Sequence, residues 1–321
     1  MTLDLNRRAA ARIDAISGTT TELGIEAQTL SSGGRVFDFG INARGGLEAG
    51  LAIADICMAG LGRVSLAQRS LVQEDGGKIG WPHVSVTTDQ PVAACLLSQY
   101  AGWQIGVGKF FAMGSGPMRA VSAGEELFGT LDYRESSDRV VGVLETSTLP
   151  DAGVFEYIAE KCRTTSDNVD LLVAPTSSMA GNLQVVARSV ETALHKLFEL
   201  GFDVGRIRSG CGSAPLSPVA RDDLAGIGRT NDAILYGGRV TLWVSGDDES
   251  LAEIGPQVPA SASDVYGRPF LEIFEQANRD FYAIDPLLFS PAEITFQNVE
   301  TGRVQSFGSV NHDVLGESFG L

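Results

Sequence analysis

One stretch of the sequence places an arginine, a glutamate and a histidine at spacings that suit proton transfer. Residues 184–195 are typical of a helix, with an apolar face formed by Val186, Val190, Ala193 and Leu197. At about 100° per residue, Arg188, Glu191 and His195 fall within about 60° of one another on the opposite side. An arginine can hold a neighbouring carboxylate in place and ionised, and such a carboxylate can take a proton from an attacking water. The alternative is an ordinary solvated Arg–Glu pair with a surface histidine beside it.

A second candidate is a glycine-rich segment that could bind an anion. Gly114, Ser115 and Gly116 precede Pro117, which suits the first turn of a helix, and Arg119 follows. Backbone N–H groups freed by the two glycines could hold a phosphate or carboxylate, with Arg119 one turn on. The alternative is a loop whose glycines merely turn the chain.

Further polar segments follow predicted strands, where α/β proteins place ligands. They contain Thr88, Asp89, Thr176, Ser177, Ser178 and Gly210. Simple helix capping by serine, threonine or aspartate is the alternative for the first two segments. In the segment 209–218, Cys211 could be a nucleophile, but no histidine lies nearby in the sequence, and we favour a loop.

Several familiar chemistries lack their motifs. Residues 106–111 begin like a dinucleotide fingerprint but lack the third glycine, and neither GxxxxGK[ST] nor GxSxG occurs. No HxxxH or HExxH pairs the three histidines, so we predict no metal site, and a magnesium site made of carboxylates alone is the alternative. The cysteines, Cys57, Cys95, Cys162 and Cys211, stand far apart and are expected to be reduced thiols.

Composition narrows the class of protein further. The 321 residues carry a net charge of −16, which argues against a general electrostatic attraction to nucleic acid or to an anionic membrane. Hydrophobic residues make up 44% of the chain, enough for a globular core. No signal-peptide h-region and no apolar run long enough for a membrane span is present, which favours the cytoplasm.

The order of predicted elements favours an α+β (mixed α/β) fold. Predicted strands cover residues 35–39, 83–87, 139–144, 169–174 and 240–244, with a hairpin at 293–299 and 303–307. Predicted helices cover residues 9–16, 47–57, 92–103, 152–162, 185–200 and 269–280. We expect two αβ domains with mixed sheets and a cleft between them, residues 1–125 and 126–321. The seam lies within 122–138, the boundary is approximate, and either domain could be discontinuous.

Taken together and in order, these segments resemble the methenyltetrahydromethanopterin cyclohydrolase family over nearly the whole chain. The matching segments are residues 57–61, 98–105, 111–120, 173–176, 188–193, 209–210, 230–232, 264–270 and 280–286.

The resemblance implies an enzyme of one-carbon metabolism that interconverts the methenyl cation of tetrahydromethanopterin and its N5-formyl derivative, using water. It implies a cytoplasmic homotrimer of two-domain subunits, with the pterin substrate between the domains and neither metal nor bound cofactor. The family's catalytic arginine and glutamate match Arg188 and Glu191. Glu191 is then expected to take the water proton and return it to the leaving nitrogen, with Arg188 orienting it or stabilising charge on oxygen. Cys211 and Ser213 depart from the pattern, which further weakens a nucleophilic role for Cys211.

The substrate-binding candidates form a longer set. They are Thr88, Asp89, Gln99, Gly114, Ser115, Gly116, Arg119, Thr176, Ser177, Ser178, Gly210 and Asn231. Two other readings of the sequence are a non-catalytic pterin-binding trimeric protein and, with less support because the fingerprint is broken, a pterin-linked oxidoreductase.

Overall fold

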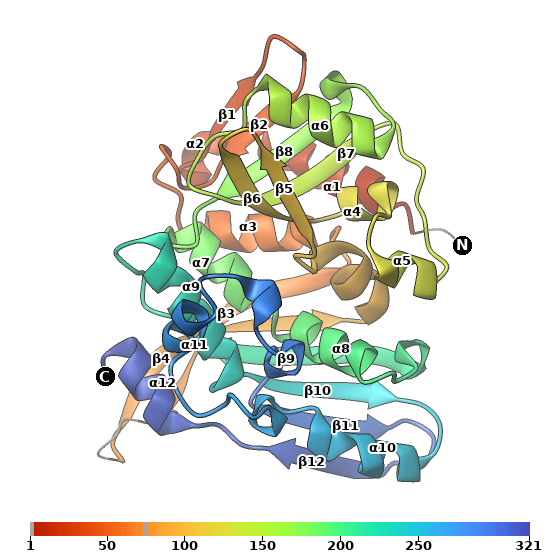
Figure 1. Ribbon diagram of the computed structural model, residues 1–321, viewed down its shortest axis with the longest axis vertical. Coiled ribbons are helices and arrows are strands. Elements are labelled where there is room, and N and C mark those ends of the chain that lie inside the picture. Colours follow the sequence, from red (N-terminus) through yellow and green to blue (C-terminus); the bar gives the residue numbers. More distant parts are fainter. Residues whose placement is uncertain (1–2, 73–75) are drawn as a thin grey trace. The chain divides into compact units, whose positions relative to one another are not determined.

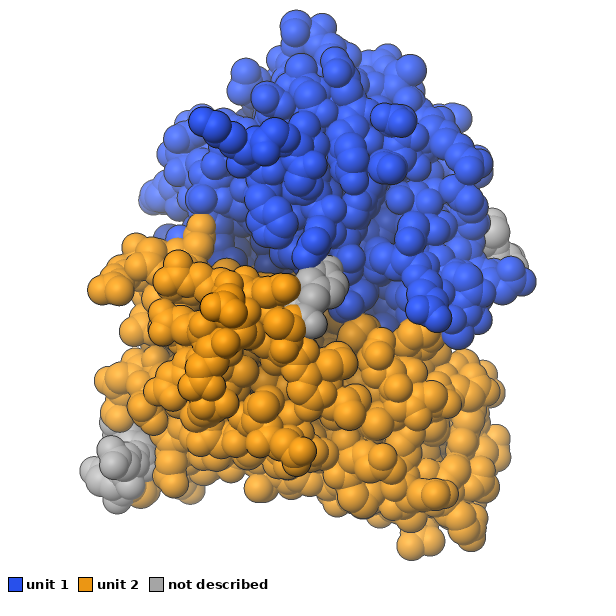
Figure 2. Space-filling model, in the orientation of Figure 1, with its two compact units in different colours: residues 1–62, 93–184 blue, residues 63–92, 185–321 orange. Residues whose placement is uncertain are grey.

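The computed structural model describes residues 3–72 and 76–321, and these divide into two compact units (Figure 2). Unit 1 comprises Met1–Gly62 and Ala93–Gln184, and unit 2 comprises Arg63–Val92 and Val185–Leu321. Both units are therefore discontinuous. This division differs from the single boundary expected near residue 125, because residues 126–184 belong to unit 1 and residues 63–92 to unit 2.

A six-stranded sheet forms the centre of unit 1 (Figure 1). In spatial order its strands are β1 (Glu26–Thr29), β2 (Arg35–Asp38), β8 (Val169–Ala174), β7 (Val140–Glu145), β6 (Phe110–Ser115) and β5 (Trp103–Val107). The strands β2, β8 and β7 run parallel, and the remaining pairs are antiparallel. Unit 1 thus contains a mixed sheet.

Helices cover both faces of this sheet, because successive residues of its buried strands are apolar on both sides. Leu172 and Ala174 of β8 pack with α1 (Leu5–Ile16) and α3 (Leu47–Cys57) in one cluster. Leu171 and Val173 pack in another cluster with α4 (Met118–Ser122) and α6 (Ala152–Cys162). The remaining helical segments here are α2 (Thr20–Leu23), α5 (Glu126–Thr130), α7 (Met179–Val186), the π-helix η1 (Val92–Gln99) and the 3-10 turn η2 (Ser166–Asn168).

Unit 2 is built on a second mixed six-stranded sheet. Its spatial order is β12 (Val304–Gly308), β11 (Glu293–Asn298), β10 (Arg239–Val244), β9 (Ile207–Pro215), β4 (Lys78–Thr88) and β3 (Gly62–Val72). Strands β10 and β11 pair in parallel, whereas β11–β12, β9–β10 and β4–β9 are antiparallel pairs. The helices are α8 (Ser189–Glu199), α9 (Asp223–Leu235), α10 (Asp248–Ile254), α11 (Phe270–Gln276) and α12 (His312–Phe319), and the 3-10 turns are η3 (Val204–Arg206), η4 (Gly255–Gln257), η5 (Ala260–Ala262), η6 (Phe281–Ala283) and η7 (Pro286–Leu288). In the part of the chain that is described, no helix is long and apolar enough to cross a membrane.

The α+β class with mixed sheets is confirmed, and so are most predicted elements. Three predictions need correction. The predicted loop 209–218 is largely strand β9, and the predicted helix 92–103 is the π-helix η1, which ends at Gln99, so that Trp103 already begins β5. The glycines at 106–108, where the fingerprint is broken, lie in the β5–β6 hairpin, and Gly108 has φ +59°. The predicted helix 185–200 is interrupted at residues 187–188, so that α7 ends at Val186 and α8 begins at Ser189.

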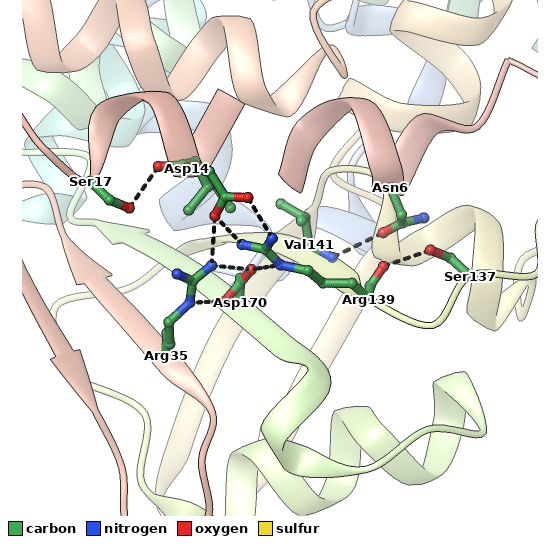
Figure 3. Close-up of polar contacts among 9 residues, drawn as sticks. Asn6, Asp14, Ser17, Arg35, Ser137, Arg139, Val141 and Asp170 are labelled. Carbon is green, nitrogen blue, oxygen red and sulfur yellow. Dashed lines mark hydrogen bonds and ion pairs between the residues drawn. The ribbon is translucent and has the colours of Figure 1, made fainter. Parts of the chain in front are cut away.

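An ion-pair cluster holds α1 against the amino-terminal ends of the parallel strands of unit 1 (Figure 3). Asp170 is 3% exposed and accepts hydrogen bonds from Arg35 Nε at 2.6 Å and Arg139 Nε at 2.6 Å. Both nitrogens of the Arg139 fork donate to Asp14 of α1 at 2.8 Å. Ligands in α/β sheets bind at the opposite, carboxyl-terminal ends of the strands, so this cluster has a structural role.

Candidate active site

The first turn of α8 carries both residues that the sequence marks for proton transfer. Arg188 is the N-cap residue, and Glu191 lies in the first turn. The backbone N–H of Thr192 donates to the carbonyl of Arg188 at 2.9 Å, which continues the helical pattern back to Arg188. The side chains of Arg188 and Glu191 are therefore helical neighbours, about 5–6 Å apart at Cβ.

Burial separates this arginine and glutamate from an ordinary surface pair. Arg188 is 6% exposed and Glu191 is 3% exposed. A buried charge is costly unless other groups compensate for it, so this arrangement is unlike a solvated pair. His195, one turn further on, is 14% exposed and its Nε2 lies 3.5 Å from a carboxylate oxygen of Glu199.

The structure brings three predicted elements of unit 2 together around this turn. Val190 lies against Gly210 of β9, and Gly210 is the register partner of Thr88 at the end of β4. Directly opposed strand residues point to the same face, so Thr88 and Gly210 both face α8. Beside them, Asp89 accepts a hydrogen bond from Ser209 Oγ at 2.7 Å.

Other predicted residues in unit 2 have local partners or a different orientation. Thr88 Oγ1 accepts from the backbone N–H of Gln90 at 3.0 Å, and Asn231 Nδ2 donates to the carbonyl of Ile227 within α9 at 2.8 Å. Cys211 lies between Gly210 and Gly212, so its side chain points to the other face of the sheet, away from α8. This placement agrees with the preference against a nucleophilic cysteine.

The segment from Gly114 to Gly116 does not form the predicted anion-binding loop. Gly114 and Ser115 end strand β6, and Ser115 Oγ donates to the carbonyl of Val143 at 3.3 Å. The backbone N–H of Gly116 already donates to the carbonyl of Ser98 at 2.8 Å. The helix that follows, α4, has only five residues and so has little dipole to offer an anion.

Arg119 has an internal role in unit 1 instead of the predicted contact with an anion. It is 0% exposed, and its Nε and Nη2 donate to the two oxygens of Glu125 at 2.8 and 2.5 Å. Its Nη1 donates to the carbonyls of Leu96 and Ser98, at the end of the π-helix that contains Gln99. Glu125 was not predicted as a partner of Arg119 from the sequence, although its position six residues after a candidate arginine was the available signal.

Thr176, Ser177 and Ser178 follow strand β8 at its carboxyl end, as predicted. Ser178 Oγ accepts from the backbone N–H of Gly181 at 3.0 Å, which is the capping role considered as the alternative. Ser115 is level with Leu172 of β8 through Val143, and Thr176 lies four residues beyond Leu172. Thr176, Ser177 and Ser178 therefore lie beyond the end of β8, whereas Gly114 and Ser115 lie level with residues inside that strand.

Within residues 3–72 and 76–321, no cluster of three or more histidine, cysteine, aspartate or glutamate residues could hold a metal ion. The first turn of α8 itself offers a buried carboxylate, that of Glu191, and a buried guanidinium, that of Arg188. A carboxylate can accept and return a proton, and a guanidinium is permanently charged with five N–H donors.

Comparison with known sequence families gives one match that spans almost the whole chain. Residues 4–319 match the family described as Cyclohydrolase (MCH). The chain belongs to the cyclohydrolase family.

Individual cyclohydrolases support the same assignment. A protein of Methylobacillus flagellatus named methenyltetrahydromethanopterin cyclohydrolase is 46% identical over 294 residues, which cover 91% of this chain and 88% of its own. Proteins with the same name from Rhodopirellula baltica (44% identical; 99% of this chain and 95% of its own) and Methanocella arvoryzae (40%; 99% of each) align over nearly their full lengths. These matches confirm the resemblance to the cyclohydrolase family that the sequence segments indicate.

Proposed function

We propose that this protein is a methenyltetrahydromethanopterin cyclohydrolase, which interconverts the methenyl cation plus water and the N5-formyl derivative. The family match and the names of the relatives support the reaction class. The single structural observation that supports it is the burial of Arg188 and Glu191 together at the start of α8.

The reaction requires two proton transfers that one carboxylate can perform in turn. Water adds to the bridging carbon of the amidinium-like cation, and Glu191 takes a proton from that water. The C–N10 bond of the adduct then breaks, N10 receives the proton from Glu191, and the remaining hydroxyl proton leaves as the formyl C=O forms. One proton is released overall, which balances the positive charge of the substrate.

Arg188 has one of two roles in this scheme. Its guanidinium either holds the Glu191 carboxylate in its working orientation or stabilises negative charge as it develops on the added oxygen. Both roles need a permanent charge beside Glu191, which arginine provides.

We propose that most of the predicted substrate-binding residues bind the substrate. They are Thr88, Asp89, Gly210 and Asn231 of unit 2, and Gln99, Thr176, Ser177 and Ser178 of unit 1. Gly114, Ser115, Gly116 and Arg119 are left out, because their polar groups are engaged inside unit 1. The substrate is a tetrahydromethanopterin derivative, the protein needs no bound cofactor, and it works as a cytoplasmic homotrimer, as the resemblance implies.

The loss of the methenyl-pterin chromophore tests this function directly. When the wild-type protein is added, the absorbance of methenyl-tetrahydromethanopterin should decrease, and no NAD(P) should be needed. Glu191→Gln should abolish turnover while leaving the pterin bound, because the amide keeps the size of the side chain but cannot accept the proton.

The possible outcomes separate three readings. Binding of the pterin without any absorbance loss by the wild type would identify a silent binding protein. A requirement for NAD(P) would identify an oxidoreductase. A Glu191→Gln variant with near-normal kcat would remove Glu191 from the proton-transfer role.

A further inference from the structure

Two glycines of β9 lie directly beneath the first turn of α8. A Cβ atom at Gly212 would lie 2.4 Å from Ser189 Oγ, 2.8 Å from Val190 Cγ2 and 3.2 Å from Ser189 Cβ. A Cβ at Gly210 would lie 2.8 Å from Val190 Cγ1 and 3.3 Å from Leu242 Cδ2. Real Cβ atoms essentially never come within 3.0 Å of another heavy atom, so either side chain would displace something.

Backbone conformation does not explain why these positions are glycine. Neither Gly210 nor Gly212 has a positive φ, so another residue could adopt either conformation. Glycine in the interior of a strand weakens it and often marks the close approach of another segment. Here the segment that approaches is the start of α8, and both glycines face it because they alternate with Cys211 along the strand.

The contact partners at Gly212 leave little freedom to accommodate a methyl group. Rotation of Ser189 Oγ would relieve the shortest contact, but Ser189 Cβ is fixed to the helix backbone and Val190 is β-branched and stiff at χ1. Ser189 is 1% exposed, and its Oγ has no hydrogen-bond partner among the described residues. The first turn of α8 is therefore held in place by shape, and a larger residue at 212 should lift it from the sheet.

We infer that Gly210 and Gly212 are positioning residues for the reaction, because they set the depth at which the first turn of α8 lies on the sheet. This inference rests on the proposed roles of Glu191 and Arg188, which that turn carries. A displacement of about 1 Å at a reacting group can cost about 100-fold in rate. A methyl group at Gly212 should therefore act on the chemical step through the helix without touching the substrate.

The kinetic test compares Gly212→Ala with a glycine that is crowded elsewhere in unit 2. We expect Gly212→Ala to lower kcat at least tenfold while KM changes less than threefold. The matched control is Gly255→Ala, where a Cβ would lie 2.1 Å from Phe307 Cε2 of β12, three strands away from β9. The control should lose thermal stability but keep kcat per folded molecule.

A rescue variant distinguishes positioning from simple destabilisation. Val190→Ala removes Cγ2, the stiff atom that would lie 2.8 Å from the added Cβ, and its own kcat serves as the baseline. Adding Gly212→Ala to Val190→Ala should lower kcat much less than Gly212→Ala lowers it in the wild type. Equal losses of kcat in both backgrounds, or an equal loss in the Gly255→Ala control, would overturn the inference.

Hydrogen exchange gives a readout that does not depend on activity. Gly212→Ala should raise amide exchange in residues 190–193 at least tenfold above the wild type, and in the Val190→Ala background the same substitution should raise it much less. Unchanged exchange would refute the positioning of α8 even if the enzyme is active. Failure of the wild type to convert the pterin would instead refute the proposed function, with the exchange result still deciding whether the glycines hold the helix.

Discussion

Arg188 occupies the N-cap position of α8, where an arginine is unusual. Serine, threonine, aspartate and asparagine are preferred there because their side chains accept from the free N–H groups of the first turn. Arg188 makes no such capping bond, and it brings positive charge to the positive end of the helix. Residues that disfavour the local structure are expected at functional sites. A buried arginine at this N-cap position therefore agrees with a functional role for Arg188.

Replacement of Arg188 should separate the effect of its charge from the effect of its shape. We expect Arg188→Gln to lower kcat by about 10²- to 10³-fold, the range typical for the loss of one stabilising donor. Arg188→Lys keeps the charge but loses the planar fork, so its kcat should fall at least tenfold. Steady-state chromophore assays measure both, with Arg221→Gln, an exposed arginine of unit 2, as the control.

A kcat near the wild-type value in Arg188→Gln would contradict a role for this residue in the chemical step. A kcat for Arg188→Lys equal to that of the wild type would show that a point charge suffices there.

Asp232 should make the stability of the protein fall as the pH rises. Its carboxylate is 1% exposed and accepts from the N–H of Phe270 at 2.8 Å and from Ser318 Oγ at 2.6 Å. Burial raises its pKa from 3.8 to about 7. Between about pH 4 and pH 7 the folded state thus holds a proton that the unfolded state has lost, and stability declines through this window.

Asp232→Asn keeps both contacts, since an amide oxygen can accept from Phe270 and an amide N–H can donate to Ser318. Relative to the wild type, this variant should therefore gain stability between pH 5 and pH 8.5. Urea midpoints at the two pH values measure the change, and Asp264→Asn at an exposed position is the control. If the urea midpoints of Asp232→Asn and the wild type differed by the same amount at both pH values, Asp232 would not titrate in this range.

Among the secondary-structure elements, the π-helix η1 is the rarest. Such helices are uncommon and often lie at functional sites. The end of η1 is held by Arg119, which donates to the carbonyls of Leu96 and Ser98 and lies 5.0 Å from the ring centre of Tyr100. Glu125 supplies the negative charge that Arg119 needs in this buried position.

Removal of Glu125 should destabilise unit 1 strongly. Glu125→Ala leaves the fully buried Arg119 without its counterion, which typically costs about 3–5 kcal/mol. The neighbouring and exposed Glu126→Ala should have a much smaller effect on stability. Thermal and urea unfolding compare the two variants. A cost for Glu125→Ala no larger than for Glu126→Ala would contradict the role of this ion pair.

The sequence predicted elements with regular apolar periods more accurately than those built from small residues. The helices α3 and α6 have the predicted bounds, since their apolar residues recur at helical spacing. Strand β9 reads as a loop because Ser209, Gly210 and Gly212 lack the branched side chains typical of strands. The break between α7 and α8 also escaped prediction, because neither proline nor glycine marks residues 187–188.

Spacing and resemblance predicted Arg188 and Glu191 as the catalytic pair, and the structure adds that both are buried. The anion-binding hypothesis for Arg119 failed for a physical reason, since the sequence did not reveal its long-range carbonyl partners. The role of Gly212 depends on how closely α8 approaches β9, which no local pattern encodes.

At the scale of the whole molecule, polar composition was a poor guide to the division into units. The polar segment 122–138 was expected to be the seam, yet it lies entirely in unit 1. One of its polar side chains, Glu135, is buried and accepts from the N–H groups of Leu5 and Asn6 at the start of α1. A segment that caps a helix of its own unit can therefore have the polar composition of a linker.

The oligomeric state is a separate prediction at this scale. We expect a homotrimer, so light scattering should give about three times the 33.9 kDa of the single chain. The mass should stay constant over a wide range of protein concentration. A constant mass of one chain would contradict the trimer without affecting the proposed reaction.

The discontinuity of both units constrains how the protein folds during synthesis. Strand β2, at Arg35–Asp38, pairs with Asp170–Val173 of β8, so the sheet of unit 1 cannot be completed until more than half of the chain has left the ribosome. Strand β4 emerges early but pairs with β9, which ends at Pro215. Each nascent chain must therefore carry, at the same time, one edge of β2 and one edge of β4 whose partner strands have not yet been made. Slower translation before residue 215 would prolong the period in which these exposed edges can aggregate or recruit chaperones.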